Sequence, residues 1–165
     1  MDRIVSVERL DDIALVRFDR RGRANALSFA MMDDLAAAAR GFETDAGVRA
    51  VVLTGAPGIF SAGMDLADPA FDRIAAMSFA ERRMLAEHGP RLARAWAAVE
   101  APTIAAIEGP CLAGGLALAA MCDFRVGAEV PASGRPRSRS PITWAGTRCP
   151  ASSPSSASRP PGASS

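Results

Sequence analysis

Apolar and polar positions along the first 129 residues form short apolar runs that are separated by longer stretches of helical period. Two apolar runs near the start flank the polar pair Asp11-Asp12, which indicates a hairpin turn between two strands. Later apolar runs contain few polar residues, which is typical of strands buried in a parallel sheet. The predicted strands cover residues 4–7, 13–18, 48–53, 103–107 and 123–126.

The first stretch between these strands has the period of a helix. Apolar side chains recur there every three or four positions, at Leu27, Met31, Leu35, Ala38 and Phe42. Ser28 is a suitable N-cap for a helix that runs to Phe42. Asp33 and Asp34 would then lie early in the helix, near the positive end of its dipole.

Two further stretches also favour helices. Residues 71–99 are helix-prone, with a break expected at Gly89-Pro90. Gly114 opens an Ala/Leu-rich helix that runs to Met121. Alternation of strands and helices predicts an α/β fold with mostly parallel pairing and right-handed crossovers.

The composition changes after Glu129. Residues 1–129 hold 14 arginines and 18 acidic residues, a net charge of −4, whereas residues 130–165 hold five arginines and no acid, a net charge of +5. The second segment also contains ten serines and seven prolines without periodicity, so we expect a disordered tail with local polyproline II character. Arg135, Arg137 and Arg139 could bind RNA or phosphate, but a solvated tail is favoured and no nucleic-acid partner is predicted.

A second explanation of this tail is translation out of frame. Its alanines, prolines, serines and arginines are the residues that GC-rich codons yield in a shifted frame. Codons for residue 130 onward can be chosen so that a neighbouring frame has the apolar periodicity that the tail lacks. We therefore expect an incomplete core at 1–129 and a tail at 130–165, and the encoding DNA would test the frameshift.

The three cysteines, Cys111, Cys122 and Cys149, form no paired framework. A reducing, cytoplasmic setting is expected for such a chain. Charged residues interrupt the N-terminus, so no signal-peptide pattern is present, and the apolar stretch 111–122 is too short to span a bilayer. No membrane partner and no metal are predicted.

Small residues gather at two places where a predicted strand ends, in segments 60–66 and 109–119. Alanine and glycine there allow a ligand to approach the backbone closely, and free N–H groups favour an anion. Amides from two strand ends could polarise one carbonyl oxygen, which would make an oxyanion hole. For either segment alone, tight helix–sheet packing is the favoured explanation. Neither segment matches a dinucleotide fingerprint or a P-loop.

Three motifs together resemble the crotonase superfamily of enoyl-CoA hydratases and isomerases. These are Asn25-Ala26-Leu27, Phe60-Ser61-Ala62-Gly63-Met64-Asp65-Leu66, and Ile104-Ala105-Ala106-Ile107-Glu108-Gly109 followed by Ala113-Gly114-Gly115 and Cys122-Asp123. The resemblance covers nearly all of residues 1–129 and implies the first part of a ββα-spiral fold that binds acyl-CoA thioesters. CoA would arrive as part of the substrate, with no separate cofactor.

The resemblance also implies roles for individual residues. The amides of Ala62 and Gly114 would hold the thioester oxygen while an enolate develops, and residues 62–65 (Ala62, Gly63, Met64 and Asp65) would face the CoA adenine and pantetheine. Asp65 could instead cap the following turn, which is the favoured role. Asp123 is expected to fix the start of a strand. Arg20 could meet a CoA phosphate or be solvated.

The chain departs from the family at the groups that transfer protons. Ala117 occupies the position of the first acid/base glutamate, and the second would fall in the segment replaced by the tail. Glu108 is not assigned a catalytic role, and His88 is expected at a surface or a helix end.

The resemblance thus implies hydration or isomerisation of enoyl-CoA in fatty acid metabolism, with impaired catalysis in this chain. A non-catalytic acyl-CoA-binding module and a non-functional truncated product are the alternatives. Intact family members form homotrimers or hexamers. Because the part that completes the core and makes the trimer contacts is not recognisable here, we expect exposed apolar surface, abnormal assembly and an aggregation-prone product.

Overall fold

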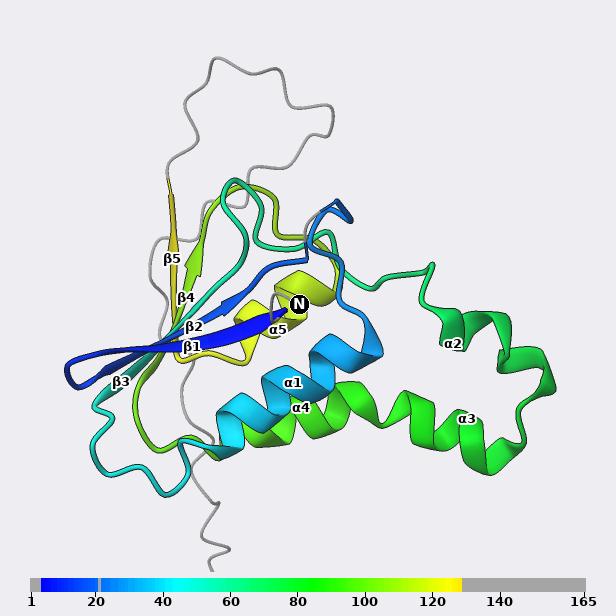
Figure 1. Cartoon of the computed structure of the whole chain (residues 1–165), viewed down its shortest axis with the longest axis horizontal. Coiled ribbons are helices and arrows are strands. Elements are labelled where there is room, and N and C mark those ends of the chain that lie inside the picture. Colours follow the sequence, from blue (N-terminus) through cyan, green and yellow to red (C-terminus); the bar gives the residue numbers. More distant parts are fainter. Residues whose placement is uncertain (1–3, 21, 129–165) are drawn as a thin grey trace, which may run out of the picture.

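The computed structural model describes residues 4–20 and 22–128 and contains one five-stranded sheet (Figure 1). Its strands are β1 (Val5–Leu10), β2 (Ile13–Phe18), β3 (Ala50–Thr54), β4 (Thr103–Ile107) and β5 (Phe124–Gly127), paired in that order. β1 is antiparallel to β2, and every later pair is parallel. The predicted hairpin and the predicted parallel pairing are therefore confirmed. The predictions for the tail lie outside the described residues.

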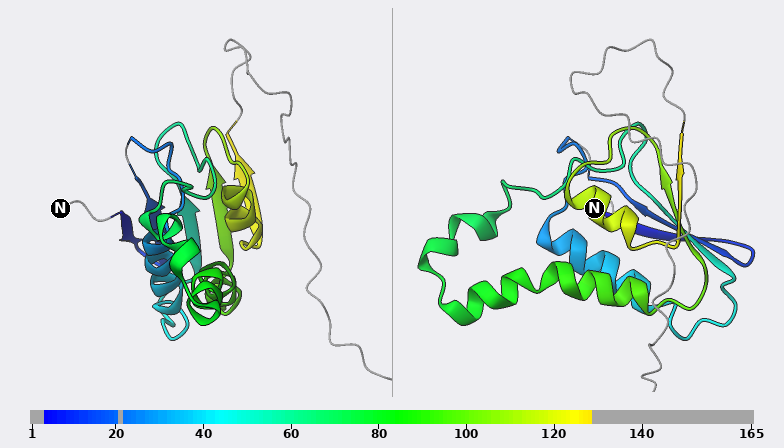
Figure 2. Two further views of the ribbon diagram at one scale, coloured as in Figure 1. Left: turned by 90° about the vertical axis from the view of Figure 1, so that its right-hand side faces the viewer. Right: turned by 180° about the vertical axis from the view of Figure 1, so that it is seen from behind.

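The helices are α1 (Phe29–Arg40), α2 (Pro69–Asp72), a 3₁₀ turn η1 (Ile74–Ala76), α3 (Phe79–Ala86), α4 (His88–Ala97) and α5 (Gly114–Ala120). Figure 2 shows that α1, α4 and α5 lie on one face of the sheet, whereas the segment from α2 to α3 extends away from it. No described element covers the other face of the sheet.

The first helix begins where the sequence predicts. The Ser28 hydroxyl accepts a hydrogen bond from the Met31 N–H at 3.2 Å, so Ser28 is the N-cap. The helix ends at Arg40, two residues before Phe42, and Asp33 and Asp34 lie beyond its first turn. The expected benefit of these two carboxylates to the helix dipole is therefore small, because the effect decays within one turn.

The segment 71–99 is more broken than its helical pattern suggests. α3 ends at Ala86, and α4 starts at His88, so the break falls just before Gly89 and Pro90. Pro90 lies in the first turn of α4, where a missing N–H breaks no intrahelical hydrogen bond. The expected break is confirmed, with the proline inside the second helix.

The core lies between the sheet and its helices. Alternate side chains of the inner strands are fully buried, among them Val16, Leu53 and Ala105, and Trp96 of α4 is buried with them. Large apolar side chains of the edge strand β5 remain exposed, with Phe124 at 45% and Val126 at 60% of their full accessibility. The sheet therefore has apolar surface at this edge that no described residue covers.

Candidate functional site

The chain segments that leave β3 and β4 run side by side. The Pro110 carbonyl accepts hydrogen bonds from the N–H groups of Phe60 and Ser61 at 3.0 and 3.1 Å, and the Leu112 N–H donates to the Ser61 carbonyl at 2.9 Å. The structure thus brings together the two glycine-containing segments that the sequence places at separate strand ends. We refer to them below as segment 60–64 and segment 110–115.

Glycine is required where these two segments touch. A Cβ atom on Gly115 would lie 2.7 Å from the Ser61 Cβ, which is closer than side chains allow. Gly63 has a φ of +101°, and a Cβ there would lie 2.9 Å from the Ala113 Cβ. Tight packing therefore explains Gly63 and Gly115, and the remaining glycine, Gly114, needs a separate account.

The amide of Ala62 is already occupied. Its N–H donates to the Ala24 carbonyl at 3.1 Å. Ala24 and Asn25 both have left-handed backbones, with φ values of 48° and 51°, and this turn carries the Ala24 carbonyl that the Ala62 N–H meets. In this structure, the Ala62 N–H is therefore unavailable to a ligand oxygen, contrary to the role that the resemblance implies for it.

The amide of Met64 faces away from its neighbouring chain. The Gly63 carbonyl accepts a hydrogen bond from the Leu27 N–H at 2.7 Å. Because the peptide between Gly63 and Met64 is trans, its C=O and N–H point in opposite directions. The Met64 N–H therefore points away from the Leu27 backbone.

The N–H groups of Met64 and Gly114 form the available pair. Neither donates a hydrogen bond to any residue within 4–20 and 22–128. A Cβ on Gly114 would lie 3.3 Å from the Met64 nitrogen. With standard covalent geometry, the two nitrogens are then no more than about 6 Å apart, so one oxygen could accept from both. A side chain at position 114 would crowd the space that a bound oxygen would occupy, which explains why this position is a glycine.

The residue that precedes Gly114 has a strained backbone. Ala113 has a φ of 44° and a ψ of −113°, a combination that residues with a side chain rarely adopt. Such backbone conformations cost on the order of 1–3 kcal/mol and gather at functional sites. The strain places Gly114 at the first position of α5 with its N–H outside the helical hydrogen-bond ladder.

Asp65 is a capping residue and an ion-pair partner. Its carboxylate accepts from the Ala67 N–H at 3.1 Å and from the Arg20 guanidinium at 2.5 Å, and Arg23 lies 3.7 Å away. Burial alone would raise the pKa of Asp65, but the hydrogen bonds from Arg20 and Ala67 and the two positive charges outweigh it and hold that pKa below its usual value. The favoured capping role is confirmed. The Arg20 guanidinium is bound to Asp65 and mostly buried, so it is not simply solvated. Its contact with a CoA phosphate stays a prediction.

Asn25 belongs to the motif Asn25-Ala26-Leu27, and the sequence alone assigns no role to its side chain. Its side-chain N–H groups donate to the carbonyls of Phe18 and Phe60 at 3.1 and 2.7 Å, and its side-chain oxygen accepts from the Arg20 N–H at 2.9 Å. The side chain is buried. Asparagine tolerates a left-handed backbone better than most residues, so its presence at position 25 is the one sequence signal for this left-handed turn.

The remaining titratable residues named from the sequence lie in structural positions. The Asp123 carboxylate accepts from the Thr103 N–H and hydroxyl at 2.8 and 2.7 Å, so it fixes the start of β4. His88 begins α4, and its ring lies 2.8 Å from the Asp33 carboxylate, as expected for a helix end. Ala117 lies one turn beyond Gly114 on the same face of α5 and carries only a methyl group.

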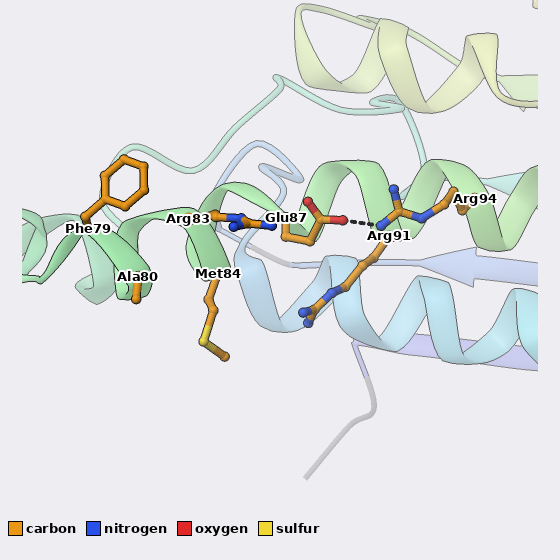
Figure 3. A pocket seen from close by; sticks show the side chains of 7 residues that line it. All are labelled: Phe79, Ala80, Arg83, Met84, Glu87, Arg91 and Arg94. Carbon is orange, nitrogen blue, oxygen red and sulfur yellow. Dashed lines mark hydrogen bonds and ion pairs between the residues drawn. The ribbon is translucent and has the colours of Figure 1, made fainter.

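Two hollows in the described part of the chain bear on the site. One, of about 630 Å³, lies between α3 and α4 and is lined by exposed arginines, Phe79 and Met84; Glu87 accepts from Arg94 there (Figure 3). Its lining includes no residue of segments 60–64 and 110–115. The other, of about 480 Å³, is lined by Arg20, Ala24 and Asn25 and so adjoins the candidate site.

Residues 4–20 and 22–128 contain no cluster of histidine, cysteine and carboxylate side chains that could hold a metal ion. In the same ranges, none of the helices has both the length and the apolar character needed to cross a membrane.

Comparison with known proteins gives consistent matches. The family model for enoyl-CoA hydratase/isomerase matches residues 8–144. A 4-chlorobenzoyl coenzyme A dehalogenase from an Arthrobacter species is 35% identical over 125 residues, which make up 76% of this chain and 45% of the dehalogenase. The chain therefore spans about half the length of the curated relatives that it matches.

Solved structures agree with this match. An enoyl-CoA hydratase/carnithine racemase from Magnetospirillum magneticum superposes with a TM-score of 0.69 and 32% identity, covering 77% of this chain and 47% of that one. An enoyl-CoA hydratase from Bacillus anthracis superposes with a TM-score of 0.65 and 31% identity, covering 76% and 47% respectively.

Proposed function

Because this chain belongs to the enoyl-CoA hydratase/isomerase family, we propose that it binds acyl-CoA thioesters and polarises the thioester carbonyl with two backbone amides. The observation that carries this proposal is the pair of unoccupied N–H groups at Met64 and Gly114. Relatives named as acting on coenzyme A thioesters support the substrate class.

The oxyanion hole is assigned to Met64 and Gly114 rather than to Ala62 and Gly114. The Ala62 N–H is hydrogen-bonded to Ala24, whereas the Met64 N–H is directed away from Leu27 and lies beside Gly114. Two amides on one oxygen would stabilise negative charge as an enolate forms, and one such donor is typically worth about 3–4 kcal/mol in a water-poor site. Gly63 and Asp65 then act as neighbours that shape the substrate-binding segment.

The same segment is proposed to contact coenzyme A. Ala62 and Met64 are partly exposed on either side of the buried Gly63. The Ala62 N–H binds the Ala24 carbonyl, and Ala24 lines the neighbouring hollow together with Arg20 and Asn25. No separate cofactor is needed, since the nucleotide is part of the substrate. Asp65 contributes indirectly, by holding Arg20 and the turn at Ala67.

Catalysis by the chain as it stands is proposed to be impaired. Ala117 cannot transfer a proton, and Asp65, the carboxylate in segment 60–66, is taken up by Arg20, Arg23 and a backbone N–H. Polarisation of the carbonyl without a group that transfers the proton favours binding over turnover. Ala117 is thus the observation that supports the second candidate function, a non-catalytic acyl-CoA-binding module.

Assembly and location complete the proposal. The exposed Phe124 and Val126 on β5 favour self-association of this chain over the trimers or hexamers of intact family members. Cys111 and Cys122 are both free thiols, which supports a reducing cytoplasmic setting. The proposed role in fatty acid metabolism rests on the family match alone.

A titration of the purified chain with crotonyl-CoA, followed by a hydration assay of the same mixture, tests this function. We expect binding that is stronger than the binding of free CoA, with little or no turnover. Rapid hydration would contradict the account of the missing proton-transfer groups. Equal affinity for free CoA and crotonyl-CoA would contradict the oxyanion hole.

A further inference from the structure

We infer that Ser61 is a positioning residue that holds the Met64 amide in place for the acyl-CoA carbonyl. The inference rests on the proposed function, because it concerns the orientation of one of the two proposed oxyanion donors. Ser61 itself touches no substrate in this account. It acts through the backbone of the residues that follow it.

Ser61 makes two buried hydrogen bonds with its hydroxyl. The hydroxyl donates to the Asn25 carbonyl at 2.9 Å and accepts from the Gly63 N–H at 3.1 Å. The side chain is fully buried. The hydroxyl therefore uses its one donor and one of its two acceptor positions within the protein.

These two bonds fix the peptide on one side of Gly63. The Gly63 N–H is turned back onto Ser61, which makes a local side-chain-to-backbone turn. On the other side, the Gly63 carbonyl is held by the Leu27 N–H at 2.7 Å. Gly63 has no side chain to restrict it and has a φ of +101°, so these contacts, rather than intrinsic preference, select its conformation.

The Met64 N–H depends on the orientation that results. It lies on the same peptide as the Gly63 carbonyl and points in the opposite direction, and the Met64 nitrogen lies close to Gly114. If the hydroxyl is removed, the Gly63 N–H loses its acceptor, and Gly63 is then held only through its carbonyl, by the Leu27 N–H. The carbonyl of Asn25 loses its donor at the same time, which loosens the left-handed turn behind segment 60–64.

The Asn25 side chain anchors this arrangement to the sheet. Its three hydrogen bonds join it to Phe18 at the end of β2, to Phe60 and to Arg20. The line of contacts from β2 through Asn25 and Ser61 to Gly63 is continuous and buried. A positioning role for Ser61 follows from this line, whereas a purely packing role would require no hydroxyl.

The test compares Ser61→Ala with a matched control, Thr103→Val, in the full chain. The control also removes a buried hydroxyl with two hydrogen-bond roles, but at the start of β4 beside Asp123, away from segment 60–64. Two measurements are made on each protein. One is the amide hydrogen exchange of Gly63 in the free protein, and the other is the infrared C=O stretch of bound, carbonyl-labelled crotonyl-CoA.

We expect Gly63 to be protected in the unmodified chain and to exchange about tenfold faster in Ser61→Ala, as the loss of one hydrogen bond implies. The carbonyl stretch should shift to lower frequency in the unmodified chain and in Thr103→Val and should lose most of that shift in Ser61→Ala, with affinity for free CoA unchanged. If Ser61→Ala retains the full shift, the inference is overturned and the proposed function stands.

An unshifted carbonyl in the unmodified chain would overturn the proposed function and the inference with it. If Ser61→Ala does not fold, the unmodified chain still decides the matter. Rapid exchange of its Gly63 amide, at the rate of an unprotected backbone, would show that the hydroxyl does not hold this peptide. Strong protection there, together with the shifted carbonyl, supports the inference.

Discussion

Replacement of Asn25 by alanine tests how far the site depends on one buried amide. The substitution removes two donors and one acceptor, which meet the Phe18 carbonyl, the Phe60 carbonyl and the Arg20 N–H. It also places alanine at a φ of 51°, where asparagine is tolerated better.

The magnitude follows from those contacts. A buried group that loses its partner costs about 1–3 kcal/mol, and some of the three groups would recover a water molecule in the space left behind. We therefore expect a loss of about 3 kcal/mol in the free energy of unfolding, a large fraction of the roughly 5–15 kcal/mol typical of a domain. With a urea m-value of about 2 kcal/mol/M, the unfolding midpoint should fall by about 1.5 M.

Urea unfolding followed by circular dichroism measures this loss. Asn25→Asp is the matched variant, because it keeps the size and the acceptor but replaces the donor that faces two carbonyls. We expect it to be destabilised at least as strongly as Asn25→Ala. The reasoning is refuted if Asn25→Ala unfolds at nearly the same urea concentration as the unmodified chain, or if Asn25→Asp is harmless.

Three further predictions concern groups at the rim of the site and in the core. Burial raises the pKa of Cys122 to about 12 and that of Cys111 to about 11. Iodoacetamide at pH 8 should therefore alkylate Cys111 slowly and Cys122 almost not at all, whereas both should react rapidly in urea. Mass spectrometry measures the extent of alkylation. Because the folded-state pKa of Asp65 is lowered, the stability that its carboxylate contributes is present above about pH 4 and is lost as the pH falls through that lowered pKa. In an acid titration, Asp65→Asn should therefore lose less stability below pH 4 than the unmodified chain. An equal loss would contradict the ion pair. Asp123→Ala leaves the Thr103 N–H and hydroxyl without their acceptor, so the free energy of unfolding should fall by about 1–3 kcal/mol, and an unchanged urea midpoint would argue against its role at the start of β4.

Much of the fold could be predicted because its signals are local. The polar turn at Asp11-Asp12 and the N-cap at Ser28 each depend on residues within a few positions, and both are confirmed. The apolar runs predict the parallel strands for the same reason. Membership of the enoyl-CoA hydratase/isomerase family and the α/β fold of its N-terminal part are also confirmed.

The details of the site could not be predicted because they depend on residues far apart in the sequence. Nothing near Ala62 indicates that its amide meets the Ala24 carbonyl, since that contact requires two successive left-handed residues. The Arg20–Asp65 pair joins residues 45 positions apart, and no local pattern predicts it. The family motif indicates the segment in which we propose the oxyanion donors, and only the hydrogen bonds favour Met64 over Ala62 within it.

The helical stretch 71–99 shows a different limit. Its pattern favours one long helix with a break, whereas the chain forms α2, η1, α3 and α4. Asp68 and Ser78 act as side-chain caps that start α2 and α3. Such caps compete with helix continuation, and periodicity alone does not register them.

The amide proton shifts of Met64, Gly114 and Ala62 test the central claim most directly. The full chain would be titrated with crotonyl-CoA and, separately, with the thioether analogue that lacks the carbonyl. We predict that the Met64 and Gly114 protons move downfield with the thioester only and that the Ala62 proton, bound to Ala24, does not. A shift of Ala62 in place of Met64, or the same shifts with both ligands, would contradict the account.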